Sequence, residues 1–257
     1  MKFLVLLLTI LPIWSRVQAR SNSRIIGGQA AIAGQFPYAA AIYKTTETGK
    51  YFCGGVLVSS EWVLTAGQCV DGAILFTIYL GTTKLEEPDS TIVTVSTDTY
   101  VLHPDYNPET LDNDIGLIKL RLPVSFSIYL DKINLPSQIL ISGETSRAYG
   151  WGQVSDDDAG VADQLNWVEL SVLSNEECKI TYGNQITDNM VCLSGNYNEG
   201  ACVGDTGSAA IQHAGRGWTI VVGISTFVSG NGCESTDPSG YTRVYHYNDW
   251  IRNVTSG

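Results

Sequence analysis

Cysteine is the residue type whose number and setting in this chain indicate most directly what chemistry to expect. The six cysteines are Cys53, Cys69, Cys178, Cys192, Cys202 and Cys233. Thiols form disulfides in oxidising compartments, and closely spaced pairs bind metals. These cysteines are widely spaced, and the three histidines are far from them in the sequence. We therefore expect three disulfides and no metal site, although the spacing alone leaves the pairing open.

The N-terminus indicates secretion, which suits disulfide formation. Lys2 precedes an apolar run from Phe3 to Trp14, and the small residue Ala19 follows. This order is typical of a signal peptide, which we assign to residues 1–19. The apolar run is too short to span a bilayer, so we expect a secreted, extracellular protein. Asn253, in Asn253-Val254-Thr255, is the predicted glycosylation site.

The charge balance argues against some partner classes. The chain has 15 basic and 26 acidic residues, for a formal net charge of −11. Such a chain repels phosphate backbones and anionic lipid. We therefore expect neither nucleic acid nor a membrane surface as a partner, and no cofactor.

The elements that must position any site are mostly strands. Short β-rich runs bounded by turn residues occupy residues 52–58, 74–80, 91–101, 115–120, 165–173 and 218–227. Many short strands at such spacing predict an all-β sandwich or barrel. Only the C-terminus has helical spacing, from Val244 to Val254. Residues 122–138 are the predicted link between two β units.

Four local sequences carry the functional signal. They are Arg24-Ile25-Ile26-Gly27-Gly28, Thr65-Ala66-Gly67-Gln68-Cys69, Asp112-Asn113-Asp114-Ile115 and Gly204-Asp205-Thr206-Gly207. In this order and spacing they resemble the chymotrypsin-like (trypsin family) serine proteases, over residues 25–257. Tyr51-Phe52-Cys53-Gly54-Gly55 and Trp62-Val63-Leu64-Thr65-Ala66 make the chain most similar to the arthropod collagenolytic proteases of the brachyurin type.

The resemblance implies a fold and a cross-linking pattern. The fold is all-β, with two antiparallel barrels of the chymotrypsin type at about residues 25–130 and 131–257, and a C-terminal helix. The implied disulfides are Cys53–Cys69, Cys178–Cys192 and Cys202–Cys233.

The resemblance also implies zymogen-type activation. Residues 20–24 are the expected pro-segment, and a trypsin-like protease would cut the Arg24–Ile25 bond. The freed Ile25 amine would pair with Asp205. That ion pair would order the oxyanion hole, which in the family is formed by the N–H groups at the positions of Gly204 and Thr206. Inheritance of these residues without use is the alternative.

Two of the three catalytic positions implied by the resemblance are substituted. The family needs a serine nucleophile, a histidine base and an aspartate, and here these positions hold Thr206, Gln68 and Asp114. A carboxamide has no nitrogen that accepts a proton near neutral pH. We expect Gln68 to donate its NH₂ group to the buried Asp114 carboxylate instead. Of the other candidate bases, His103, His213 and His246, none occupies a position that faces the cleft in the family.

The expected specificity pocket differs from that of the trypsins. Its family positions hold Gly200, Thr226, Phe227, Val228 and Ser239. Gly200 replaces the aspartate that selects Lys or Arg, Phe227 keeps the aromatic wall, and Val228 and Ser239 narrow the space. We expect a neutral pocket that admits at best a small apolar group.

Three functional hypotheses follow. The first is a secreted, inactive homologue that binds peptides, protease inhibitors or a paralogous protease. The second is a weakly active endopeptidase with Thr206 as its nucleophile. The third is a structural or storage protein without a ligand.

Overall fold

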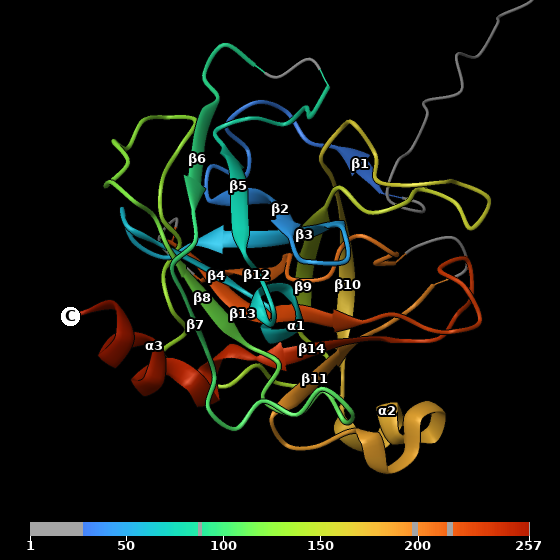
Figure 1. The fold of residues 1–257 in the computed structure, drawn as a ribbon. Helices are drawn as coiled ribbons and strands as arrows, with labels where there is room; N and C mark the ends of the chain where they lie inside the picture. Colours follow the sequence, from blue (N-terminus) through green and yellow to red (C-terminus); the bar gives the residue numbers. More distant parts are fainter. Residues whose placement is uncertain (1–27, 87–88, 197–199, 215–217, 257) are drawn as a thin grey trace, which may run out of the picture.

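The fold is built from two antiparallel sheets of seven strands each (Figure 1). The structure is a computed structural model that describes residues 28–86, 89–196, 200–214 and 218–256. The predicted signal peptide, the pro-segment, Arg24 and Ile25 lie outside the described residues.

The first sheet has the strand order β6-β5-β2-β3-β4-β8-β7. Its strands are β2 (Ala39–Thr45), β3 (Lys50–Leu57), β4 (Trp62–Thr65), β5 (Leu75–Leu80), β6 (Val93–Thr97), β7 (Tyr100–Leu102) and β8 (Gly116–Lys119). The interior is filled by fully buried aliphatic side chains such as Ile42, Leu64 and Ile78. Gly55 is required there, because a Cβ atom would lie 2.7 Å from Ile42 Cδ1. Tight packing of this kind fixes the strands that lead to the site.

The second sheet has the order β1-β10-β11-β14-β13-β12-β9, and pairing of β9 with β10 closes six of its strands into a ring. Its strands are β1 (Gln29–Ala30), β9 (Thr145–Gly150), β10 (Asn166–Leu173), β11 (Met190–Leu193), β12 (Ala209–Ala214), β13 (Trp218–Phe227) and β14 (Ser239–Arg243). The expected all-β fold with two chymotrypsin-type barrels is confirmed. The stretch without strands between β8 and β9, which connects the two sheets, contains the predicted link at 122–138.

Three sequence expectations about elements need correction. Residues 91–101 form two strands, because β6 pairs with β5 whereas β7 pairs with β8. The short strand β1 pairs with β10 of the second sheet, although the sequence placed it in the first barrel. A helix also forms away from the C-terminus, at α2 (Asn175–Tyr182). Its signal was a capping box, in which Ser174 and Glu177 bond each other's backbone N–H groups.

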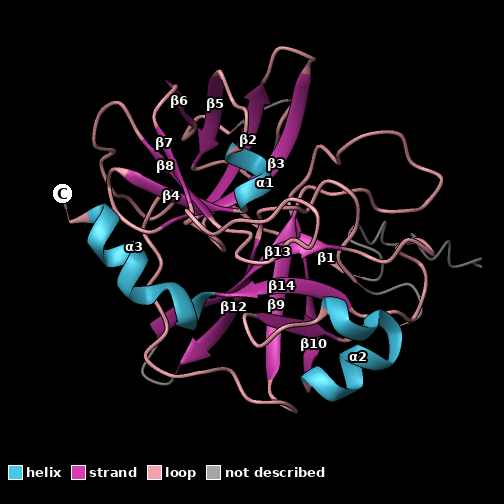
Figure 2. Cartoon of the chain, turned by 60° about the horizontal axis from the view of Figure 1, so that its bottom comes forward, coloured by secondary structure: helices cyan, strands magenta, loops and turns pink. Residues whose placement is uncertain are grey.

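The remaining helices lie near the junction of the sheets and at the C-terminus. Helix α1 (Gly67–Val70) follows β4, and α3 (Asn248–Thr255) follows a 3₁₀ turn at Val244–Tyr247. Figure 2 shows the two sheets one above the other, with α3 along the side where they meet. No helix among the described residues is long and apolar enough to cross a bilayer.

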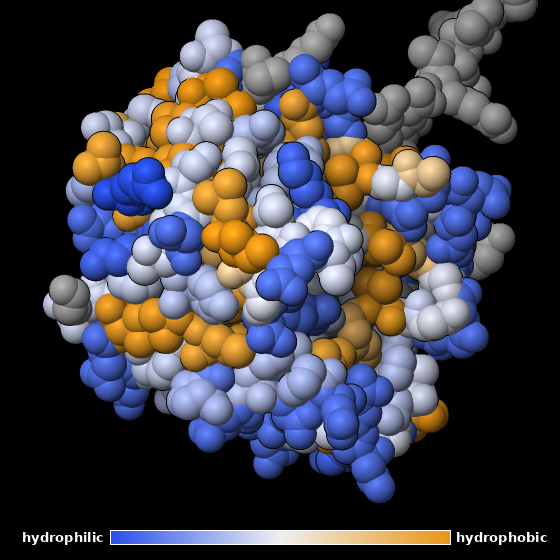
Figure 3. Space-filling view, in the orientation of Figure 1, coloured by the Kyte–Doolittle hydropathy of each residue, from blue (hydrophilic) through white to orange (hydrophobic). Residues whose placement is uncertain are grey.

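The structure forms the three disulfides that the resemblance implies, Cys53–Cys69, Cys178–Cys192 and Cys202–Cys233. On the surface, hydrophilic side chains alternate with several separate apolar patches on the face shown in Figure 3.

Candidate functional site

Gln68 and Asp114 meet where α1 follows β4 and where the chain enters β8. Asp114 has no exposed surface, and its Oδ1 accepts the backbone N–H of Gln68 at 2.8 Å. The Gln68 side chain donates from Nε2 to Asp114 Oδ2 at 2.8 Å, as the sequence predicted. Nε2 also donates to the carbonyl oxygen of Thr226 at 2.9 Å. Both amide hydrogens of Gln68 are therefore used within the protein, one on the buried Asp114 carboxylate and one on the Thr226 carbonyl oxygen.

The electrostatics of Asp114 follow from its burial. Burial raises the pKa of the Asp114 carboxyl to about 6, against the opposing effect of hydrogen bonds from Gln68, Thr226 and Gly67. The turn before it is tight, since Asn113 has a left-handed backbone with φ at 54°. In this setting Gln68 is a hydrogen-bond donor to Asp114 and has no basic nitrogen to offer a substrate.

Thr206 lies on a loop whose shape depends on two glycines. Gly204 and Gly207 have φ values of 97° and 83°, and a Cβ atom on Gly207 would lie 2.4 Å from the carbonyl oxygen of Gly54. The Thr206 carbonyl oxygen accepts the Gly54 N–H at 2.8 Å, which ties the loop to β3. Within the described part of the chain, the Thr206 hydroxyl and the backbone N–H groups of Gly204 and Thr206 have no hydrogen-bond partner. These groups are free to contact a ligand.

Asp205 points away from this loop into the protein. It is 3% exposed, and its two oxygens accept the N–H groups of Gly152 at 2.8 Å and Cys202 at 2.9 Å. Burial raises the pKa of its carboxyl to about 6. No basic side chain of the described residues pairs with it. Its predicted partner, the Ile25 amine, belongs to the undescribed N-terminus.

The histidines are bonded elsewhere. His103 packs edge-on against Tyr247, and its Nδ1 accepts the N–H of Asp105. His213 bonds Arg147 and Thr219. His246 bonds Asn189. None of the three rings makes a hydrogen bond to Gln68 or Thr206 among the described residues.

The expected specificity pocket is nearly closed, with a volume of about 10 Å³, enough for about one water molecule. Gly200, Val228 and Ser239 line it together. Two other predicted pocket residues, Phe227 and Thr226, do not line it. Phe227 packs its ring against Tyr182, with ring centroids 5.0 Å apart, and over Gly240. The Thr226 hydroxyl instead bonds Thr242 at 2.9 Å, beside Asp114.

The sequence predicted a neutral pocket. That prediction was wrong, because Asp237 is among the lining residues. Hydrogen bonds from Ser229 and Asn231 hold the pKa of the Asp237 carboxyl below its usual value, so it is anionic at neutral pH. No local motif marks this residue. It reaches the pocket only through the course of the loop after β13.

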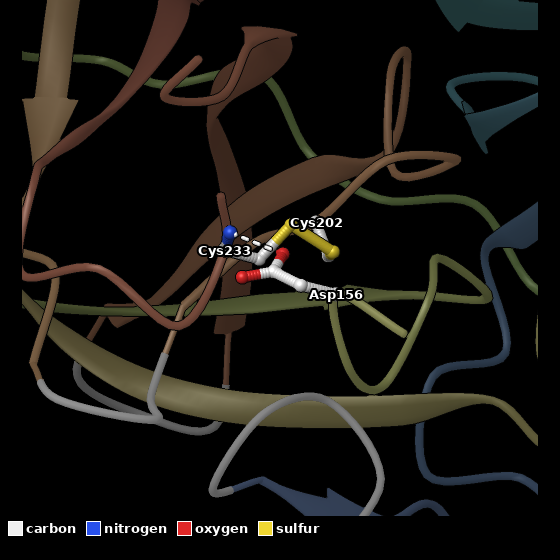
Figure 4. A group of neighbouring side chains, drawn as sticks. All are labelled: Asp156, Cys202 and Cys233. Atoms are coloured by element: carbon white, nitrogen blue, oxygen red, sulfur yellow. Dashed lines mark hydrogen bonds between the residues drawn. A yellow bond between two sulfur atoms is a disulfide. The ribbon is translucent and has the colours of Figure 1, made fainter. Parts of the chain in front are cut away.

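A second cluster of potential ligand atoms lies on the loops beside this pocket. Asp156, Cys202 and Cys233 bring a carboxylate and two sulfurs within 4.8 Å of one another (Figure 4). The two sulfurs form a disulfide, so neither is a thiolate that could bind a metal. The Asp156 carboxylate accepts the N–H groups of Cys233 at 2.7 Å and Glu234 at 3.2 Å. This cluster therefore joins two loops and does not suit a metal ion.

The predicted glycosylation site, Asn253, is exposed near the end of α3. The structure thus brings Gln68 and Asp114 into contact and places Asp205 and Thr206 side by side on the neighbouring loop. Of the predicted site residues, Arg24 and Ile25 lie outside the described residues.

Comparison with known proteins places this geometry in a family. The Trypsin family profile matches residues 25–251. The chain is 35% identical to brachyurin from Leptuca pugilator over 231 residues, which cover 90% of this chain and 98% of that one. It is 32% identical to trypsin I-P38 from Gallus gallus over 261 residues, which cover 100% and 99%. A solved structure titled HL collagenase superposes with a TM-score of 0.81 at 31% identity, covering 91% and 99% of the two chains. This chain belongs to the trypsin family of serine proteases.

Proposed function

We propose that this chain is a secreted trypsin-family protein that has lost proteolysis and acts by binding. Its cleft would hold a peptide, a protease inhibitor or a partner protease without cutting it. The observation that carries the proposal is the use of both Gln68 amide hydrogens, which donate to Asp114 and to the Thr226 carbonyl oxygen.

The chemistry of peptide hydrolysis explains why this matters. The nucleophile's proton must pass to a base whose pKa is close to the working pH. Gln68 offers only an amide oxygen, and the three histidines are bonded to other residues. Loss of one central triad member costs about 10⁶ in turnover in a serine protease. Thr206 without a base would therefore turn over substrate far too slowly for digestion.

Binding, by contrast, needs only what remains. The unpartnered N–H groups of Gly204 and Thr206 can donate to a ligand carbonyl. The pocket beside them excludes large side chains, because it is lined by Val228 and Ser239 and has a volume of only about 10 Å³. Secretion and cleavage at Arg24–Ile25 belong to the same proposal and rest on the sequence signals described above.

Hydrolysis of peptide amides and casein tests the proposal. The protein is cut after Arg24, and N-terminal sequencing confirms that Ile25 is exposed. We expect no turnover above that of the Thr206→Ala variant. Turnover that survives purification and disappears in Thr206→Ala would contradict the proposal and make this a threonine-dependent endopeptidase.

Restoring the two substituted groups separates lost chemistry from a lost scaffold. We expect the double variant Gln68→His, Thr206→Ser to hydrolyse small-P1 peptide amides at least about 10³-fold faster than the parent chain. A folded double variant without activity would mean that the cleft lacks more than its two reacting groups. If the parent cleft then bound neither peptide nor inhibitor, a structural or storage role would be favoured.

A further inference from the structure

The surface around Trp218 takes no part in the cleft. Its side chain is 60% exposed, although Trp218 begins a strand of a packed barrel. Beside it lies an open groove of about 580 Å³, lined by the apolar side chains of Val58, Ile133, Leu135 and Ile220 and by the cationic ones of Lys132 and Arg252. We call this surface the Trp218 groove.

The groove is a built feature of the fold. Residues 133–135 are pinned to β13, because the Val221 N–H donates to the Asn134 carbonyl at 3.0 Å and Asn134 donates back to Thr219. The Ile133 N–H donates to the Leu57 carbonyl at 2.8 Å. These bonds hold the lining segment in place without a ligand. A preformed site of this kind loses little conformational freedom on binding.

The charge of the groove is opposite to that of the chain. Lys132 and Arg252 line it, and none of the described residues that line it is a carboxylate. Arg252 has one acidic neighbour, Asp249, at 3.9 Å, with a side chain that is 97% exposed. Such an exposed pair is weak and leaves the guanidinium free to bind another anion. In a protein of net charge −11, this surface is complementary to an anionic partner.

A second groove, of about 410 Å³, adjoins the first. It shares Lys132, Ile133, Asn134 and Trp218 with the first groove, and it adds one carboxylate, Asp131. Trp218 therefore lines both hollows, and an extended chain could contact the indole while occupying both.

We propose that the Trp218 groove binds an acidic peptide segment of a partner protein, one that also carries apolar side chains. Its carboxylates would pair with Lys132 and Arg252, and an apolar side chain would pack on the Trp218 indole. Exposed tryptophans that lie beside arginine often dominate the binding energy at protein interfaces. The apolar lining favours a peptide over a sulfated polysaccharide, which has no side chain to bury there.

Two matched synthetic peptides test this proposal on the full folded chain. One alternates Glu with Leu and Phe, and the other has Gln in place of every Glu. Binding is followed by calorimetry and by the NMR signal of the Trp218 indole N–H, assigned with Trp218→Phe. We expect the acidic peptide to shift this signal, to bind at least about tenfold more tightly than the Gln peptide, and to weaken as salt is raised.

Charge reversal provides the variant and its control. Lys132→Glu, Arg252→Glu should weaken binding of the acidic peptide at least about tenfold while leaving the tryptophan in place. Lys50→Glu, Lys179→Glu reverses two charges outside the groove and should change binding far less.

The proposal would be overturned if the two peptides bound equally, or if the acidic peptide still bound after reversal of the Lys132 and Arg252 charges. It would also be overturned if neither peptide bound at millimolar concentration. Heparin that binds more tightly than the acidic peptide and equally well to Trp218→Ala would overturn it as well. The groove shares no residue with the cleft, so these outcomes are independent of the hydrolysis assays.

Discussion

Asp114 and Asp205 are both buried carboxylates whose pKa values burial raises to about 6, yet the protein treats them differently. Asp114 has a neutral side-chain donor, Gln68. Asp205 has only two backbone N–H donors and no side-chain partner among the described residues. Asp114 thus has its side-chain partner within the described residues, whereas for Asp205 we propose the Ile25 amine.

The largest predicted effect is on the pH dependence of stability. Both carboxyls hold their protons more tightly folded than unfolded, so the free energy of unfolding should fall as the pH rises from about 4 to 6. Each group contributes about 2 kcal/mol to that fall. Cleavage after Arg24 should supply the Ile25 amine to Asp205 and lower the pKa of the Asp205 carboxyl. The contribution of Asp205 to the fall in the free energy of unfolding should then disappear.

Urea unfolding of the uncut and cut chains between pH 4 and 7 measures this difference. We expect the uncut chain to lose about twice as much stability as the cut chain over that range, and the uncut Asp205→Asn variant to behave like the cut chain. Identical pH profiles for the two forms would show that the N-terminus does not reach Asp205.

A smaller effect is expected at the closed end. Gln68→Ala should lower the free energy of unfolding at pH 7 by about 2 kcal/mol, because Asp114 Oδ2 and the Thr226 carbonyl oxygen both lose a donor in a buried setting. Gln153→Ala is the matched control, since the Gln153 side chain donates to the Asp158 carbonyl on an exposed loop. It should change stability by less than about 0.5 kcal/mol. Equal losses of unfolding free energy in the two variants would contradict the structural role of Gln68.

The smallest predicted effect is on stability when Asp156 is replaced, and it tests whether burial is what makes a carboxylate costly to remove. Asp156, like Asp205, accepts two backbone N–H groups. Asp156 is exposed, however, so water can accept these N–H groups in place of its carboxylate. Asp156→Ala should therefore cost only about 1 kcal/mol in thermal or urea unfolding. A chelator should leave the melting temperature unchanged, since the neighbouring sulfurs form a disulfide. A melting temperature that falls on chelation would mean that metal does bind there.

The six predicted β-rich runs overlap seven of the fourteen strands of the described residues, because alternating β-branched residues and turn residues are local signals. Sequence analysis missed α2, whose face is mostly polar and whose signal was the cap at Ser174. It also treated residues 91–101 as one strand, because the change of partner from β5 to β8 is a tertiary event. The same limit applies to the pocket, where Asp237 enters through the loop after β13 and Phe227 turns toward Tyr182.

The sequence by itself determined that Gln68, and not a histidine, lies beside Asp114, and with it the lack of a basic ring nitrogen there, because proton affinity belongs to the side chain. It also determined the family, through motifs in a fixed order. Only the tertiary structure decided how Gln68 divides its two hydrogens, which residues line the pocket, and that Lys132, Trp218 and Arg252 share one groove. Those facts depend on distances between segments far apart in the chain, and distances of that kind are set by the packing of the two barrels.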